Sequence, residues 1–162
     1  MMLASSGWAP PASASSTAYE FRIVKYATAT VTVPDEHHQL GDWIKVTGEG
    51  SFDTSTGAIE GAGSFTHYNV NGTVHMQGAW VASAFTSFTP FDAPVKGKQG
   101  GVLWLTVNLY DETGALCTCM GSGGVAMSLT STLNAPPGTV GGITLGPFGQ
   151  PTGGTISIAL EG

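Results

Sequence analysis

Apolar side chains alternate with polar or small ones along most of the chain, a pattern typical of strands that bury one face. The alternation begins at Tyr19 and continues to residue 33, with Thr at even positions from residue 28. It returns in residues 102–109, 125–129 and 156–160, whereas no segment has a convincing helical period. The pattern therefore predicts an all-β protein, an antiparallel meander of about eight or nine strands.

A glycine-rich unit, Gly-x-Gly-Ser-Phe, occurs at residues 48–52 and again at residues 61–65, with a short polar turn between the two copies. The copies predict adjacent antiparallel strands. Glycines at every second position of a strand indicate sharp coiling or a close backbone approach, and barrels use them to bend a sheet around on itself. We therefore expect a small up-and-down β-barrel, with a two-sheet β-sandwich as the alternative.

The dipeptide Asn71-Gly72 is the strongest hairpin signal in the chain. With these two residues at the centre of the turn, Tyr68 faces His75 and His67 faces Met76. One face then carries Phe65, His67, Asn69, Val74, Met76, Gly78 and Trp80, and we expect it to point toward the core. The opposite face carries Ser64, Thr66, Tyr68, Thr73, His75 and Gln77.

Length and composition indicate a single domain preceded by an arm. Residues 1–18 are rich in Ala, Ser and Pro and predict a flexible or extended N-terminal arm, in which Trp8 is the one aromatic candidate for docking. Residues 19–162 are predicted to form one β-barrel domain. The first residues lack the basic and apolar regions of an intact signal peptide, and the low Lys content favours an extracellular or cell-surface location without fixing the compartment.

The charge balance excludes several partners. The chain has five Lys and Arg residues and a formal net charge of −6, so it lacks the basic surface that nucleic acids require. An anionic membrane surface is disfavoured for the same reason. No apolar run is long enough to cross a bilayer, so we expect no membrane insertion.

The two cysteines, Cys117 and Cys119, are separated by one residue. A bridge between them would close almost no loop, so the sequence predicts no structural disulfide and two small thiols buried in the barrel. A soft-metal site with Met120 nearby is the alternative. His37 and His38 lie beside Asp35 and Glu36, but adjacent histidines rarely chelate one ion, so we expect a solvated loop, no metal and no cofactor.

His67 is the first candidate for chemistry because the register places it among apolar side chains. It could act as an acid or base or contact a ligand, or it could be a core histidine hydrogen-bonded to a neighbour.

The segment Val46–Phe52, with Thr56-Gly57, is loosely similar to strand–turn–strand units of allene oxide cyclase-like and dirigent-like barrels. The resemblance implies a barrel whose interior binds and folds a hydrophobic substrate. No residue of this chain matches the functional motifs of those families, so the resemblance adds no site residue.

The sequence supports three functional hypotheses. The first is a small, largely apolar ligand in the barrel lumen, lined by Phe52, Phe65, His67, Asn69, Met76 and Trp80. Its catalytic form is a cyclase or isomerase using His67, and whether the chain is an enzyme is left open. The second is a structural subunit that forms homo-oligomers through the N-terminal arm. The third is a carbohydrate-binding module with Trp43 and Trp104 as an exposed platform.

Overall fold

A computed structural model describes residues 17–121 and 123–161 of the chain. Nine antiparallel strands and no helix occur within these ranges, which confirms the all-β prediction. Their bounds are β1 Ala18–Thr30, β2 Trp43–Asp53, β3 Ile59–Tyr68, β4 Val74–Pro90, β5 Gly101–Asp111, β6 Leu116–Cys117, β7 Val125–Ser131, β8 Gly142–Leu145 and β9 Gln150–Leu160. The predicted arm lies outside the described residues except for its last two positions.

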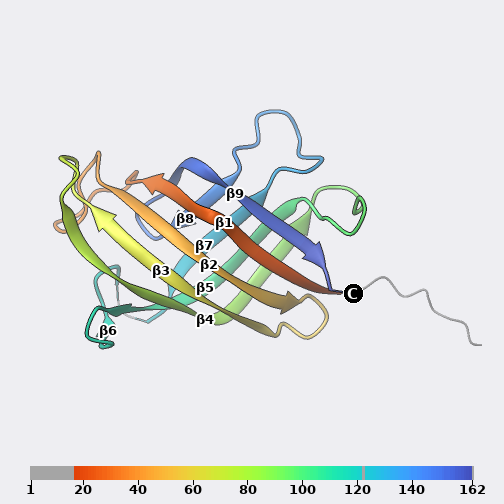
Figure 1. Cartoon of the computed structure of the whole chain (residues 1–162), viewed down its shortest axis with the longest axis horizontal. Helices are drawn as coiled ribbons and strands as arrows, with labels where there is room; N and C mark the ends of the chain where they lie inside the picture. Colours follow the sequence, from red (N-terminus) through yellow and green to blue (C-terminus); the bar gives the residue numbers. More distant parts are fainter. Residues whose placement is uncertain (1–16, 122, 162) are drawn as a thin grey trace, which may run out of the picture.

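The strands form one sheet in the order β8-β7-β5-β4-β3-β2-β1-β9, and the short β6 pairs with β5 (Figure 1). The chain meanders from β1 to β5, and β9 returns to pair with β1. Strands β8 and β9 lie side by side, but no strand pairing between them occurs in the described part of the chain. The sheet is therefore nearly closed into a barrel with one unsealed seam, and the barrel prediction is confirmed.

The repeated glycine unit pairs with itself across β2 and β3, as the sequence predicted. Gly48 faces Gly63 and Gly50 faces Gly61. The indole of Trp80 lies against the first pair, and the Phe21 ring lies against the second. A Cβ at Gly50 would come within 2.6 Å of the Phe21 ring. The glycines therefore make room for two large aromatic side chains inside a tightly coiled sheet.

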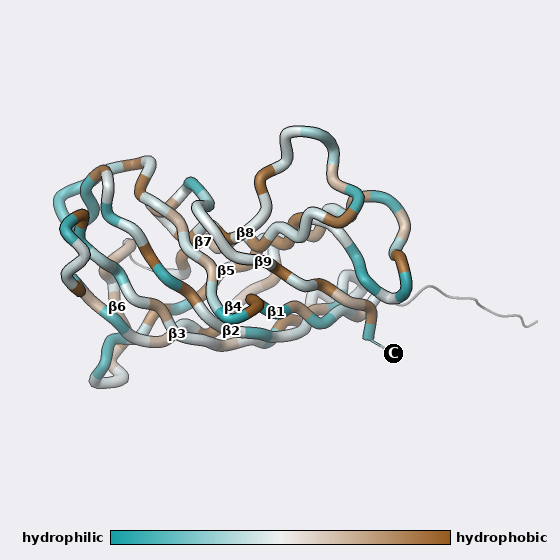
Figure 2. Tube along the Cα trace, turned by 45° about the horizontal axis from the view of Figure 1, so that its top comes forward, coloured by the Kyte–Doolittle hydropathy of each residue, from teal (hydrophilic) through white to brown (hydrophobic). Residues whose placement is uncertain are grey.

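Buried apolar side chains fill the middle of the barrel. Alternating residues of the long strands point inward, so hydrophobic and hydrophilic segments alternate along the trace (Figure 2). The largest fully buried side chains are Trp80, Phe21, Phe65, Phe148, Ile44, Leu103, Leu105, Leu109, Met127, Leu129, Ile143 and Leu145. In the described ranges, no helix is long and apolar enough to cross a membrane.

The β3–β4 hairpin has a different turn from the one predicted. The Asn69 amide donates to the Thr73 carbonyl at 2.8 Å, so three residues, 70–72, form the loop. Gly72 takes a φ of 88°, which suits a left-handed position after such a turn. A register shift follows, and Tyr68 pairs with Val74 rather than with His75.

The shift compensates for the extra loop residue, so His67 still pairs with Met76 as predicted. One expectation was wrong, however, because Val74 is 52% exposed rather than inward-facing. His75 is exposed, as expected for the outer face, yet its ring centroid lies 4.6 Å from that of His67. The bulge turns this histidine toward the end of the barrel.

Candidate functional site

One end of the barrel holds a pocket of about 340 Å³, which we call the barrel-end pocket. Its walls come from the loop after β1, from β3 and β4, and from the segment around β6. The lining residues are His37, His38, Phe65, His67, His75, Met76, Cys117, Thr118, Cys119 and Met120. The whole chain has four histidines and two cysteines, and all six line this pocket.

His67 is buried and is held by Asp42, which precedes β2. The His67 Nε2 and Asp42 Oδ2 atoms are 2.9 Å apart, and the side chains are 3% and 5% exposed. Burial tends to raise the pKa of Asp42, but hydrogen bonds from His67 and from the Gln39 and Val70 amides outweigh it and lower the pKa. Because the carboxylate is ionised, His67 Nε2–H must donate, which leaves Nδ1 with a free lone pair.

The pKa of His67 lies below its ordinary value. Burial is the largest cause, and the nearby rings of His75 and His38 lower the pKa further, against the opposing effect of Asp42. A neutral imidazole whose orientation is fixed by a carboxylate is suited to accept a proton near neutral pH.

The loop before β2 is exposed at most positions, as expected, but His38 is 2% exposed and so is not solvated. Asp35 Oδ1 accepts hydrogen bonds from the amides of His37 and His38 and from His38 Nδ1, at 2.8, 2.8 and 2.9 Å. The His38 hydrogen bond is the main cause of the lowered pKa of Asp35. Asp35 therefore folds the loop back over the barrel end. His37 remains exposed, as predicted.

The rings of His38 and His67 stack with their centroids 5.1 Å apart. Each of the two rings also makes an edge-to-face contact with the ring of Phe148. Phe148 lies in the turn between β8 and β9 and is fully buried. Each of the two imidazoles donates one ring N–H to an aspartate, His38 to Asp35 and His67 to Asp42. The loop before β2 and the turn between β8 and β9 thus fix the two histidine rings beside the pocket.

Cys117 and Cys119 form a disulfide, contrary to the prediction of free thiols. We had predicted free thiols because a bridge that closes so short a loop adds little stability. Such a bridge can nevertheless form where the chain turns sharply. The strand expected over residues 116–120 ends at Cys117, and the Gly121 amide bonds back to the Thr118 carbonyl. The turn brings the two sulfur atoms together at the pocket wall.

The residues predicted to line a ligand site are divided among four places. Phe65, His67 and Met76 line the barrel-end pocket. Phe52 lies at the opposite end, in contact with Tyr19, Phe85 and Phe88. Trp80 is buried between the two ends, and its Nε1–H donates to the Thr47 carbonyl at 2.7 Å. Asn69 lies in the hairpin turn and donates to Thr73 Oγ1.

Sequence reasoning missed Asp42, placed His38 in a solvated loop and assigned His75 to the outer face without its contact to His67. The pairing of Asp42 with His67 joins residues 25 positions apart and leaves no local pattern. The Asp35-x-x-His38 spacing was visible as a turn signal, because Asp side chains commonly accept hydrogen bonds from amides two or three positions later.

The two tryptophans proposed as a platform lie on separate strands. Trp43 is half-buried on β2 and stacks on Tyr68 at 4.1 Å. Trp104 is 41% exposed on β5, which is separated from β2 by the two strands β3 and β4. The pair therefore forms no continuous surface.

Comparison of the chain with known proteins gives no indication of its function. No family model matches the chain, and no curated protein or solved structure is significantly similar to it. Among residues 17–121 and 123–161, no group of three or more His, Cys, Asp and Glu side chains is arranged to hold a metal ion.

Acidification is expected to destabilise the protein through His67. The unfolded chain protonates a histidine below about pH 6.5, while burial keeps His67 neutral in the folded protein, so stability should fall as the pH drops below that value. One such proton contributes a limiting slope of about 1.4 kcal/mol per pH unit. Urea unfolding between pH 7.5 and 5 measures this slope. His67→Gln should flatten it and the exposed His37→Gln should not, and equal slopes in both variants would contradict the assignment.

Proposed function

We propose that this protein binds a small, largely apolar molecule in the barrel-end pocket, with His67 as the polar contact. The observation that supports the proposal is the convergence of all four histidines and both cysteines on one hollow. These residues come from four separate segments of the chain. A fold that needed only stability would gain little from gathering its few reactive side chains at one end of a barrel.

The chemistry of the walls favours a compact ligand with one polar group. Phe65, Met76 and Met120 supply apolar surface, and no Asp or Glu side chain is among the described residues that line the pocket. Pockets for small molecules are mostly apolar and contain a few fixed polar groups. The volume of about 340 Å³ is near the lower end of the range for such pockets, so the ligand is small.

The catalytic form of this proposal is a proton transfer within the bound molecule, as in an isomerase or cyclase. The Asp42–His67 pair supports this form because it provides an oriented neutral base. Shape complementarity and one base are sufficient for such reactions when the substrate is held in a reactive conformation.

Native mass spectrometry of freshly purified protein, with a denatured control, tests the proposal. We expect extra mass that is lost on denaturation, and enhanced fluorescence of anilinonaphthalene sulfonate that an extract of the released molecule reverses. Thr118→Trp places a large ring at the exposed edge of the pocket and should abolish both signals. Thr113→Trp, in the exposed β5–β6 turn, is the matched control and should leave them unchanged.

A bare chain that fails to bind the dye, or equal binding by both tryptophan variants, would refute the proposal. Bare chains found in large assemblies would instead favour the structural-subunit hypothesis. That hypothesis depends on the N-terminal arm, most of which lies outside the described residues.

A further inference from the structure

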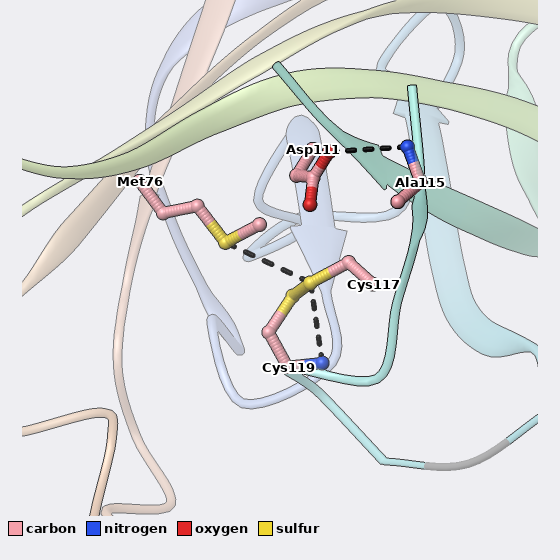
Figure 3. The surroundings of a disulfide bond; sticks show 5 residues. All are labelled: Met76, Asp111, Ala115, Cys117 and Cys119. Atoms are coloured by element: carbon pink, nitrogen blue, oxygen red, sulfur yellow. Dashed lines mark hydrogen bonds between the residues drawn. A yellow bond between two sulfur atoms is a disulfide. The ribbon is translucent and has the colours of Figure 1, made fainter. Parts of the chain in front are cut away.

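Three sulfur atoms meet at one wall of the barrel-end pocket (Figure 3). The Met76 side chain extends from β4 toward the Cys117–Cys119 disulfide, and its Sδ lies 3.7 Å from the Cys117 Sγ. The Cys119 amide donates to the same Cys117 sulfur at 3.2 Å. Because Cys117 is bridged, it has no S–H to donate, and the contact with Met76 is one between sulfur atoms.

We propose that reduction of the Cys117–Cys119 disulfide creates a binding site for Cu(I), with the two cysteine thiolates and the Met76 thioether as ligands. This inference rests on the proposed function only in that it uses the same pocket. It makes the ligand chemistry of the pocket depend on redox state. The disulfide form takes the small molecule, and the dithiol form also takes the metal.

The sulfur positions suit a trigonal metal. Metal–sulfur bonds of about 2.3 Å arranged in a triangle place the sulfur atoms about 4 Å apart. Met76 and Cys117 are already separated by 3.7 Å. The Cα atoms of the two cysteines are 5.3 Å apart, so after reduction their sulfurs can separate by side-chain rotation without movement of the backbone.

The donor set selects Cu(I) over harder ions. Thiolate and thioether sulfurs are soft ligands, which prefer Cu(I), and carboxylate and carbonyl oxygens suit Mg²⁺ and Ca²⁺. No carboxylate of the described residues lines the pocket. Zinc normally takes four ligands of nitrogen, anionic sulfur or carboxylate oxygen, and a thioether is not among its usual donors.

The redox step needs a dithiol reductant. The dithiol donates two electrons and two protons, the Sγ–Sγ bond breaks to give two cysteine thiols, and the dithiol becomes its own disulfide. Binding of Cu(I) then displaces the two thiol protons to solvent as two Cu–S bonds form, and the Met76 lone pair forms the third bond. Copper keeps its oxidation state throughout.

The test is an anaerobic titration of the full chain with Cu(I). Protein is reduced with dithiothreitol, desalted under nitrogen, and made to compete with bathocuproine disulfonate for the metal. We expect one Cu(I) per reduced chain, a thiolate-to-copper charge-transfer band in the ultraviolet, and no binding by the oxidised protein. Cys117→Ser should weaken the band and lower the affinity for Cu(I), because it removes one of the two thiolate ligands. Met76→Leu should weaken the affinity for Cu(I) about tenfold or more. Removing a residue that only supports a metal ligand already costs about tenfold, and Met76 is proposed as a ligand itself.

Met127→Leu is the matched control, because Met127 is fully buried in the core and does not line the pocket. Its copper affinity should equal that of the unmodified chain. Failure of the reduced chain to compete, equal copper binding by the oxidised chain, or equal affinity in the Met76→Leu and Met127→Leu variants would overturn the proposal. Dye binding by the oxidised protein reports separately on the small-molecule proposal, so failure of one is distinguishable from failure of the other.

Discussion

Replacing Trp80 with alanine is expected to reduce the free energy of unfolding by about 3–5 kcal/mol, the usual cost of removing a large aromatic side chain from a core. Trp80 is fully buried, and its ring occupies the space that Gly48 and Gly63 leave open on the neighbouring strands. The substitution would also leave the Thr47 carbonyl without the indole donor. Urea unfolding followed by circular dichroism measures the loss.

Gly63→Ala tests the other half of the same contact. A Cβ at this position would overlap the Thr47 carbonyl oxygen and come within 2.5 Å of the Trp80 Nε1. Backbone and indole would both have to move, so we expect a clear loss of stability.

Trp104→Ala is the control for Trp80→Ala, because Trp104 is 41% exposed and its removal should cost about 1 kcal/mol or less. Equal losses of stability for Trp80→Ala and Trp104→Ala would mean that the packing of Trp80 against Gly48 and Gly63 contributes little to the free energy of unfolding.

Removing either partner of the Asp42–His67 pair is expected to cost about 3 kcal/mol, because the remaining buried group loses its hydrogen-bond partner. Asp42→Ala leaves the His67 N–H without an acceptor, and His67→Leu leaves a buried carboxylate without its ring donor. The double variant should lose less than the sum of the two single losses, since both members of the pair are then absent. Urea unfolding of the four proteins at pH 7.5 gives the coupling energy.

His37→Leu controls for the effect of changing a histidine in this region. Its side chain is 65% exposed, so the stability change should stay within about 0.5 kcal/mol. Additive losses for Asp42→Ala and His67→Leu would contradict a coupled buried pair. They would also weaken the argument that Asp42 orients His67 for proton transfer, so this cycle tests the site as well as the fold.

Strand formation in this chain is a local property, and so it could be predicted. Alternating apolar positions define an inner and an outer face wherever one side of a sheet is buried, and the repeated glycine unit could pair only with strands that approach closely. Phe65 and His67 were correctly placed on the inner face. The hairpin register survived an incorrect turn because the bulge that accompanies a three-residue loop restored the pairing of His67 with Met76.

Tertiary structure alone decided how the site is composed. Asp42, His38 and Phe148 reach His67 from loops that have no periodic pattern, and their contacts depend on where the barrel ends and how the loops fold over it. The disulfide depends on a sharp turn after β6, which the Cys-x-Cys spacing does not specify. The sequence by itself determined a coiled, glycine-bent β-barrel with His67 inside, because side-chain alternation and backbone sterics act between near neighbours. Which distant groups share the pocket was decided by closure of the sheet, because only closure brings loops from separate strands to one end.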